Sequence, residues 1–239
     1  MKSTIEEIEN FFKAQAEMYG KDILLDGRLT DPRVEIKPVS APVSAVATAP
    51  KKTGANPLEQ FYFDIKECQL CPLGKTRTNF VFGVGNPKAD LMFIGEAPGR
   101  DEDLQGIPFV GRAGQLLTLM LQTIGLKRED VFIANVLKCR PPNNRDPQTE
   151  EIEKCEPYLL KQIEMISPRL IVTLGRFASA SLLRTKAALG ALREEVHSYN
   201  QVPLVVTYHP AALLRNPQLK RQAWIDLKRI NHLLQREEK

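Results

Sequence analysis

Two patterns of hydrophobic positions alternate along the chain from about residue 57 onward. Short apolar runs, typical of buried strands, predict strands at 90–95, 131–137, 169–174 and 203–208. Apolar residues at helical spacing predict helices at 58–67, 113–124, 149–166, 176–184 and 217–236. Because strands and helices alternate, we expect a three-layer α/β/α fold with a central, four-stranded parallel sheet.

Two different segments precede this alternating region. An amphipathic helix is predicted within residues 1–20, where apolar side chains recur on one face at Ile5, Ile8, Phe12 and Ala16. Residues 21–56 are rich in proline and small residues and cannot bury enough apolar surface to offset the entropy of ordering. We expect a flexible linker there, followed by one folded domain over 57–239.

Composition adds modest constraints. The 239 residues are 43% hydrophobic and 26% charged, enough for one core and a tail. The net charge of +4 suits a polyanionic partner but is too small to identify one. No apolar stretch approaches the roughly 20 residues of a membrane helix, and the N-terminus lacks the apolar core of a secretory signal. We therefore expect no membrane partner and a cytoplasmic location in which thiols stay reduced.

Candidate binding and catalytic residues follow the predicted strands. Glu96, Asn135, Gly175 and His209 come at or just after the four strand ends. The carboxyl ends of parallel strands share one rim, where α/β folds build their binding sites. The segments 95–103 and 108–114 add glycines, acidic residues and the aromatic Phe109 to this rim.

Each of these side chains has a functional and an ordinary interpretation. His209 is either a donor to an oxygen that gains negative charge or a plain loop histidine. Asn135 either reads a polar ligand edge or braces a loop, and Phe109 either stacks on a planar ligand or packs in the core. Glu96 and Glu102 belong to an acidic cluster that either faces a cleft or decorates a helix start.

A basic, proline-stiffened loop runs from Lys138 to Arg145. Its charges suit contacts with phosphates, whereas a solvated charged loop is the simpler interpretation.

Four cysteines form the other candidate site, spaced C-x2-C, then far apart, then C-x15-C, at Cys68, Cys71, Cys139 and Cys155. This pattern favours a four-sulfur metal site, with zinc and an iron-sulfur cluster equally compatible. Buried reduced thiols and a C-x2-C redox pair remain alternatives. Four protein sulfurs leave no open position for substrate, so such a site would be structural.

Taken together, these motifs resemble the family 4 uracil-DNA glycosylases, the iron-sulfur branch of their superfamily. The similar segments are 95–114, 135–145 and 209–215, and the order and spacing of the cysteines match as well. The resemblance covers the chain from about Pro57 to the C-terminal helix and leaves residues 1–56 outside.

The resemblance implies a catalytic domain over 57–239 that holds a [4Fe-4S] cluster on the four cysteines. It implies a monofunctional enzyme that flips uracil out of DNA and hydrolyses its glycosidic bond, leaving an abasic site for base excision repair. Phe109 would stack on the uracil, Asn135 would bind its Watson-Crick edge, and His209 would stabilise the negative charge on the departing base.

Other roles follow from the same resemblance. Glu96, Asn144 and Glu102 are candidates for positioning water or closing the pocket. Glu102 and Ala97 are also candidates for uracil binding. Ala97 and Gly99 stand in the first motif where better-known relatives carry an aspartate and a tyrosine. No lysine occupies the centre of either motif, so we expect no Schiff base. Candidate DNA contacts are Arg140, Arg145, Leu213, Leu214 and Arg215.

The partners follow from this interpretation. We expect a monomer that acts on uracil-containing DNA near the nucleoid. Residues 5–12 also have the spacing of a sliding-clamp-binding peptide but lack its leading glutamine, and a helix packed on the domain is the simpler hypothesis. Two other classes remain open: a catalytically silent DNA-binding or scaffold protein, and a small-nucleotide enzyme with a phosphate-binding loop.

Overall fold

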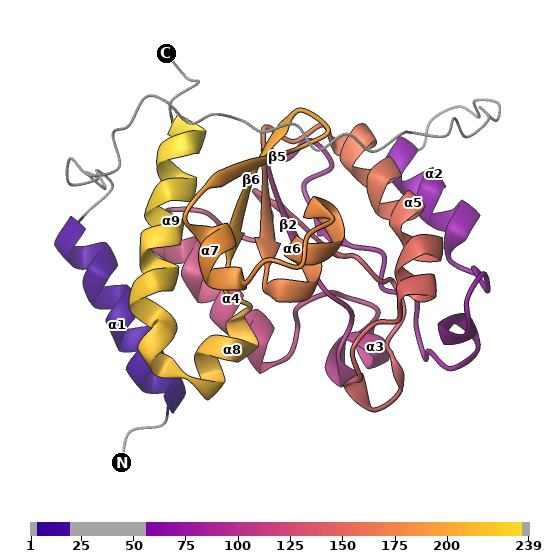
Figure 1. Ribbon diagram of the computed structural model, residues 1–239, viewed down its shortest axis with the longest axis horizontal. Helices are drawn as coiled ribbons and strands as arrows, with labels where there is room; N and C mark the ends of the chain where they lie inside the picture. Colours follow the sequence, from indigo (N-terminus) through magenta and orange to yellow (C-terminus); the bar gives the residue numbers. More distant parts are fainter. Residues whose placement is uncertain (1–3, 20–55, 236–239) are drawn as a thin grey trace.

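A six-stranded sheet forms the centre of the part of the chain that the structure describes, with helices on both faces (Figure 1). The computed structural model describes residues 4–19 and 56–235. The strand order is β1-β3-β2-β4-β6-β5. The strands are β1 (Val84–Gly85), β2 (Leu91–Gly95), β3 (Phe132–Asn135), β4 (Leu170–Leu174), β5 (Val196–Tyr199) and β6 (Val202–Thr207).

The four strands β3, β2, β4 and β6 are parallel, which confirms the predicted parallel sheet. β1 and β5 extend it by one short antiparallel strand at each edge, and the sequence did not predict either. β5 and β6 are joined by Asn200 and Gln201, with φ values of 47° and 68°. Such tight hairpins usually contain glycine, so this one lacked a recognisable turn signal. β1, with two residues, is too short to form an apolar run.

Helices form one layer on each face of the sheet, as predicted. α1, α4, α8 and α9 pack with Leu91 and Phe93 of β2, whereas α2, α5, α6 and α7 pack with Met92 and Ile94. Successive strand residues point to opposite faces, so β2 contributes to both cores. The helices are α1 (Thr4–Tyr19), α2 (Pro57–Ile65), α3 (Arg100–Gln105), α4 (Arg112–Thr123), α5 (Thr149–Ile166), α6 (Arg176–Leu183), α7 (Leu189–Arg193), α8 (Pro210–Arg215) and α9 (Lys220–Gln235).

Short helices border the edge of the sheet at which the parallel strands end. α3 follows β2 and α8 follows β6, and both lie along the lower edge of the sheet in Figure 1. Each has six residues, too few to show a helical repeat in the sequence. Three 3-10 turns complete the described elements: η1 (Pro72–Lys75), η2 (Pro142–Asn144) and η3 (Pro217–Leu219). No helix in the described ranges is long and apolar enough to cross a membrane.

The predicted N-terminal helix is present as α1 and lies beside α9 (Figure 1). Ile8 and Phe12 are fully buried, and the Phe12 ring packs edge-on against Trp224, with centroids 6.3 Å apart. Lys220 pairs with Glu7 at 2.5 Å. This packing favours a docked amphipathic helix over a clamp-binding peptide, because Ile8 and Phe12 already lie in the core. The linker prediction for residues 21–56 falls almost wholly outside the described residues.

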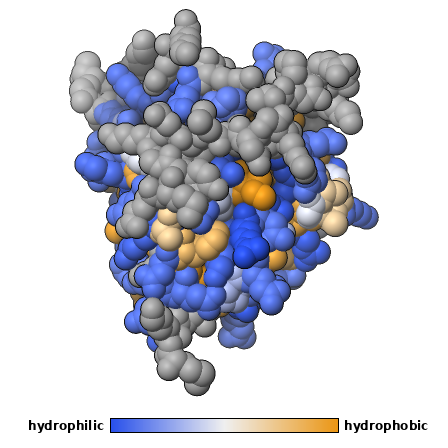
Figure 2. Space-filling view, turned by 90° about the vertical axis from the view of Figure 1, so that its left-hand side faces the viewer, coloured by the Kyte–Doolittle hydropathy of each residue, from blue (hydrophilic) through white to orange (hydrophobic). Residues whose placement is uncertain are grey.

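The described residues on the side of α1 and α9 form a mostly hydrophilic surface, with hydrophobic patches between the hydrophilic residues (Figure 2). The apolar side chains of both helices that the structure describes as buried therefore face the sheet, as expected of amphipathic helices on a folded core.

Candidate active site and cysteine site

Glu102, in the first turn of α3, joins two loops at the carboxyl edge of the sheet. Its carboxylate accepts hydrogen bonds from the backbone N–H groups of Gly99, Val110 and Gly111, at 3.1, 3.0 and 3.0 Å. These bonds connect the loop after β2 to the loop that carries Phe109. The structure thus gives Glu102, a candidate for base binding, a bracing role within the site.

Phe109 is buried on this second loop, and its backbone has a φ of 54°, a strained value for an aromatic residue. Two contacts hold it there. Arg128 donates from its guanidinium to the backbone oxygens of Phe109 and Pro108, at 3.1 and 2.9 Å. Gly114 lets α4 approach closely, since a Cβ there would lie 1.7 Å from the Phe109 oxygen. The ring direction is therefore set by the surrounding backbone.

Asn135 ends β3, and its side-chain oxygen has no partner. The residue is 2% exposed, and Oδ1 is buried without a hydrogen bond. An unpaired buried acceptor costs about 1–3 kcal/mol, so its presence calls for a reason. A Cβ on Gly95 would lie 2.3 Å from this oxygen and 2.7 Å from Cζ of Phe109. Gly95 is therefore required here, because it lets the amide and the ring approach the end of β2 more closely than any side chain would allow.

His209 follows β6 and forms the N-cap of α8. Its Nδ1 accepts a hydrogen bond from the Ala211 N–H at 3.1 Å, which places the proton of the neutral ring on Nε2. Burial, with a smaller contribution from Arg215, lowers the pKa of His209 to about 4. The close approach of Gly175 requires glycine, because a Cβ there would lie 2.9 Å from the His209 Cβ. At neutral pH the imidazole is an uncharged donor through Nε2–H.

The three predicted base-contacting residues come together around Gly95. The rings of Phe109 and His209 lie 5.4 Å apart with an interplanar angle of 31°. Asn135 Oδ1 and Phe109 both border the space that a Gly95 Cβ would fill. An aromatic face, an amide edge and a neutral imidazole suit a flat, polar ligand with an oxygen that gains charge.

Glu96 is the acidic residue nearest this group in the chain. Burial, with a smaller contribution from the charge of Asp146, raises the pKa of Glu96 to about 7, and Arg176 opposes the shift. A carboxyl group that titrates near neutral pH is typical of a general base or of a water-positioning residue. Ala97, the next residue, packs against the core on the side of α5.

The basic loop differs from its prediction at one position. Lys138 is fully buried, and its ammonium donates to the Asn135 backbone oxygen at 2.8 Å and to Gln162 Oε1 at 2.5 Å. The expectation that this lysine helps to grip phosphates is therefore wrong, because its charge lies in the interior. Sequence reasoning missed this position, since a lysine beside two arginines looks like a surface residue.

Arg140, Asn144 and Arg145 of this loop already have intramolecular partners. Arg140 Nε donates to Asn144 Oδ1 at 2.7 Å, and both side chains lie toward the surface. Arg145 makes two hydrogen bonds to the buried carboxylate of Glu151, at 2.9 and 2.6 Å. A DNA contact by Arg145 would have to share a guanidinium that already holds the loop to α5.

Two leucines of α8 were predicted to press into the duplex, and the structure separates them. Leu213 is fully buried in the core formed with α4 and α9, so it does not reach DNA in this conformation. Leu214 is partly exposed and Arg215 is exposed. The correction arises because adjacent residues on a helix point in different directions, which the sequence motif does not show.

The four cysteines lie around a single small cavity, although 87 residues separate the first from the last. All four are free thiols, and Cys139 and Cys155 are buried. Gly74 allows the turn around Cys68 to close, since a Cβ there would lie 2.7 Å from the Cys68 backbone oxygen. The structure thus brings together every cysteine that the sequence assigned to one site.

The cysteine geometry does not separate the two metal interpretations. A zinc ion requires ligand sulfurs about 2.3 Å from one point. In the described ranges, no group of three or more His, Cys, Asp or Glu side chains is arranged to hold a metal ion. The four thiols border one small cavity, and cysteine sulfurs are ligands both of structural zinc and of iron-sulfur clusters.

Hydrogen-bond donors point at three of the four sulfurs. The Tyr158 hydroxyl contacts Cys68 Sγ at 3.3 Å, Arg77 Nη1 contacts Cys139 Sγ at 3.3 Å, and the Lys138 N–H contacts Cys155 Sγ at 3.3 Å. Donors of this kind stabilise thiolates. Burial, with smaller contributions from Cys139 and Cys71, raises the pKa of Cys155 to about 12 although Lys138 opposes the shift, so a cationic group is needed to hold it as a ligand.

Sequence reasoning missed several residues that organise the active site. Arg128, which holds the Phe109 loop, lies in a charged stretch that resembles ordinary solvated surface. Asp146, on the loop before α5, and Arg176, the first residue of α6, act on Glu96. Arg176 had a usable signal, because it follows Gly175 at the end of a predicted strand, whereas Asp146 had none.

Comparisons with known proteins agree with this geometry. Residues 82–228 match the model of the uracil DNA glycosylase superfamily. A type-4 uracil-DNA glycosylase of Archaeoglobus fulgidus is 51% identical over 184 residues, covering 74% of this chain and 92% of that protein. The enzyme of the same name from Saccharolobus solfataricus is 47% identical over 180 residues, covering 72% and 83%. That from Sulfurisphaera tokodaii is 46% identical over 190 residues, covering 74% and 84%. The chain therefore belongs to the type-4 uracil-DNA glycosylases of the uracil DNA glycosylase superfamily.

Proposed function

We propose that this chain removes uracil from DNA by hydrolysing the bond between the base and its deoxyribose, leaving an abasic site for base excision repair. The observation that carries the proposal is the unpaired Oδ1 of Asn135, buried beside the Phe109 ring and close to the neutral His209. A glycosylase acts on an extruded base, which needs a pocket with an aromatic face and a polar edge.

Asn135 and Phe109 account for recognition of the base. Uracil presents an N–H donor at N3 next to a carbonyl acceptor at C4, and a carboxamide offers the complementary acceptor and donor. Oδ1 lacks an internal partner, so the N3–H of uracil satisfies it on binding. Cytosine, which has an acceptor at N3, would leave this oxygen unpaired, and this accounts for discrimination.

His209 acts as the glycosidic bond breaks. The bonding electrons move to the base, and negative charge develops on uracil N1 and its neighbouring oxygens. Nε2–H of the neutral imidazole donates to one of these oxygens while Nδ1 remains tied to the Ala211 N–H. A low histidine pKa keeps the ring from being charged before the substrate binds.

Glu96 is our candidate for positioning the attacking water. Water adds its oxygen to C1′ of the sugar, and its proton goes to Glu96 and then to the uracil anion, so that atoms and charge balance. Asn144 is a weaker candidate, because its side chain is exposed and already accepts from Arg140. Lys138 is buried on Asn135 and Gln162, which agrees with hydrolysis that uses no Schiff base.

The DNA contacts of this proposal lie on the surface near the site. Arg140, Leu214 and Arg215 retain exposed surface on the basic loop and α8. Arg145 supports the same loop through Glu151. We propose that the enzyme acts as a monomer on nucleoid DNA in the cytoplasm. Gel filtration with and without a uracil duplex tests the oligomeric state.

We further propose that Cys68, Cys71, Cys139 and Cys155 hold a [4Fe-4S] cluster. Their shared cavity and the donors to their sulfurs support the assignment. Through these cysteines, a bound cluster would join the turn after α2, the basic loop and α5 as a structural element. Equal amounts of iron and acid-labile sulfide in the purified protein are expected, and zinc in their place would contradict the assignment.

A duplex with a single uracil tests the central proposal. Incubation with the full-length protein followed by hot alkali should break the uracil strand at one position and leave a matched thymine duplex intact. Binding without strand breakage would instead indicate a catalytically silent DNA-binding protein.

A further inference from the structure

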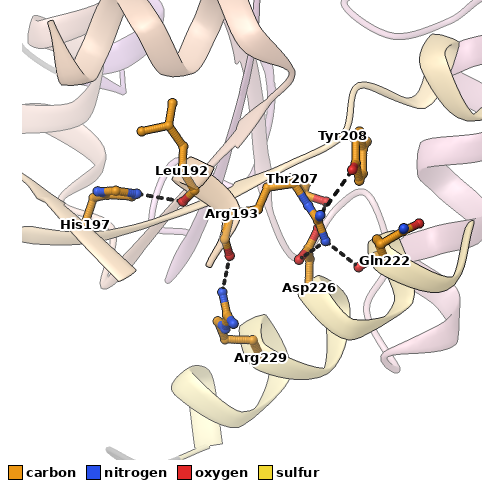
Figure 3. Close-up of polar contacts among 8 residues, drawn as sticks. All are labelled: Leu192, Arg193, His197, Thr207, Tyr208, Gln222, Asp226 and Arg229. Atoms are coloured by element: carbon orange, nitrogen blue, oxygen red, sulfur yellow. Dashed lines mark hydrogen bonds and ion pairs between the residues drawn. The ribbon is translucent and has the colours of Figure 1, made fainter. Parts of the chain in front are cut away.

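A buried ion pair lies beneath the end of β6, the strand that leads into His209 (Figure 3). Arg193, at the end of α7, and Asp226, in α9, are 6% and 1% exposed. Arg193 donates to both carboxylate oxygens of Asp226 through Nε and Nη2, each at 2.8 Å. The pair therefore joins helices from the two opposite layers of the fold.

The same two charges bind the residues that precede His209. The Thr207 hydroxyl donates to Asp226 Oδ2 at 2.6 Å. Arg193 Nη1 donates to the Tyr208 hydroxyl at 3.2 Å, and its guanidinium lies 4.3 Å from the centre of the Tyr208 ring. Both residues point toward Arg193 and Asp226 in Figure 3. The last two positions before the imidazole are thus held through their side chains.

Further contacts fix the supporting pair itself. Arg193 Nη2 donates to the Gln222 backbone oxygen at 2.9 Å, and Arg229 donates to the Arg193 backbone oxygen. His197 of β5 contacts the Leu192 backbone oxygen at 2.7 Å, which ties α7 to the edge strand. Every contact drawn in Figure 3 thus constrains α7, α9 or the end of β6.

Stability is a weak explanation for this arrangement. Replacing a buried ion pair by well-packed apolar residues is often neutral or stabilising, because burying two charges is costly. The pair instead fixes the position of α7 relative to α9 through a bidentate contact, whereas hydrophobic side chains at this point would allow the two helices to slide past each other. That point is adjacent to a residue whose donor must face a reacting oxygen.

We propose that Arg193 and Asp226 are positioning residues that hold the end of β6 so that Nε2–H of His209 faces the departing base. The inference rests on the proposed function, since it concerns the geometry of base release. They touch neither base nor sugar and act through Thr207 and Tyr208. A displacement of about 1 Å at a reacting group is enough to slow catalysis about 100-fold.

The sharpest test uses Thr207→Val, which keeps the shape of the side chain and removes its hydrogen bond to Asp226. Thr123→Val is the matched control, because Thr123 is also buried and its hydroxyl donates to the Met120 backbone oxygen within α4. Full-length variants are compared by single-turnover base release, by Kd for a duplex with a non-hydrolysable uracil analogue, and by Tm. Arg193→Lys retains the charge and loses the bidentate fork.

We expect Thr207→Val and Arg193→Lys to slow base release by about 10- to 100-fold with little change in Kd. Thr123→Val should lower Tm similarly and leave the rate unchanged. Equal rates in Thr207→Val and Thr123→Val would overturn the proposal and leave the pair a purely structural role. Asp226→Asn extends the series if it folds, and the other two variants suffice if it does not.

Nitrogen NMR of the His209 ring separates this inference from the proposed function. We expect the Nε2–H signal to shift or broaden in Thr207→Val and to stay in place in Thr123→Val, whether or not DNA is present. If the wild-type protein released no uracil, the proposed function would fail while this readout still tested the positioning of His209. An unchanged signal in Thr207→Val would contradict the inference.

Discussion

The base pocket and the cysteine site differ in whether their buried polar atoms have hydrogen-bond partners. In the pocket, Asn135 Oδ1 lacks a partner and Phe109 has a strained backbone. Around the cysteines, donors reach the sulfurs of Cys68, Cys139 and Cys155. A site for a transient ligand keeps its groups unsatisfied until the ligand arrives, whereas a site for a resident group surrounds its ligands with supporting contacts.

This difference predicts where stability and activity separate. Changes around the cysteines should unfold or destabilise the protein, because the proposed cluster would connect distant parts of the chain. Changes in the pocket should reduce base release while the fold survives, since strain and unpaired atoms at a site are already costly to stability.

The largest effect is expected for Cys155→Ser, which removes one ligand of the proposed cluster from the core. We expect loss of bound iron and destabilisation by more than about 3 kcal/mol, because binding of a structural metal group contributes directly to folding. Iron analysis and thermal unfolding followed by circular dichroism measure this. A variant with wild-type Tm and no iron would show that the cysteine site does not hold the fold together.

The next effect is expected for His209→Ala, which removes the donor to the departing base. Single-turnover release should fall by about 10²- to 10³-fold, the usual effect of losing one such donor. The loss of the α8 cap should lower stability by about 1 kcal/mol. Kd for the uracil duplex should change far less than the rate, and equal losses in both would contradict a transition-state role.

The contrast between these regions was only partly predictable from sequence. The parallel strands were predictable because buried strands leave apolar runs, and their ends indicated Asn135 and His209 correctly as neighbours of one rim. Which residues face inward was not predictable. Lys138 and Leu213 are buried because they pack against elements distant in sequence, and the local sequence motifs do not show this burial.

Bracing interactions were also beyond sequence reasoning. Glu102 was recognisable as part of an acidic cluster, but its three backbone partners come from two loops that only the fold brings together. The ion pair of Arg193 and Asp226 joins α7 to α9 across 33 residues of sequence. Such pairs arise from tertiary structure, whereas strand ends and cysteine spacing are local patterns.

Asn135→Asp tests the unpaired acceptor directly. An ionised aspartate offers only acceptors, so we expect uracil release to fall by about 10- to 100-fold and discrimination against cytosine to weaken. Single-turnover assays on duplexes containing uracil or cytosine measure both. Asn135→Ala should retain the wild-type Tm, since it removes an unsatisfied atom. Unfolding of either variant would identify the amide as a structural brace.

Lys138→Met tests whether the two regions are independent. Lys138 donates to the Asn135 backbone oxygen through its side chain and to Cys155 Sγ through its backbone, so it contacts both regions. Removing the ammonium leaves two buried acceptors unpaired and should cost about 1–3 kcal/mol, with a parallel fall in base release. Lys161→Met, on the exposed face of α5, is the control and should change neither. If Lys138→Met lowered the stability but not the rate of base release, the base pocket and the cysteine site would be independent.

The smallest effect is the dependence on pH, to which the pocket contributes two opposing groups. The raised pKa of Glu96, about 7, means that the folded state retains a proton between about pH 4.5 and 7 that the unfolded state has lost. This contribution to stability therefore declines as pH rises through that window. The lowered pKa of His209, about 4, acts in reverse: the unfolded state binds the proton first, so stability declines as pH falls from about 6.5 to 4.

Near neutral pH, the rate of base release should depend on the ionisation of Glu96 and not on that of His209. Base release should rise with pH through about 7 as Glu96 ionises, and His209 should add no further limb above pH 5 because it is already neutral. Glu96→Gln should flatten the rate profile and the stability profile together. If the rate limb near pH 7 persisted in Glu96→Gln while its stability profile flattened, Glu96 would be a buried carboxyl of the pocket wall, and the water would be held by another residue.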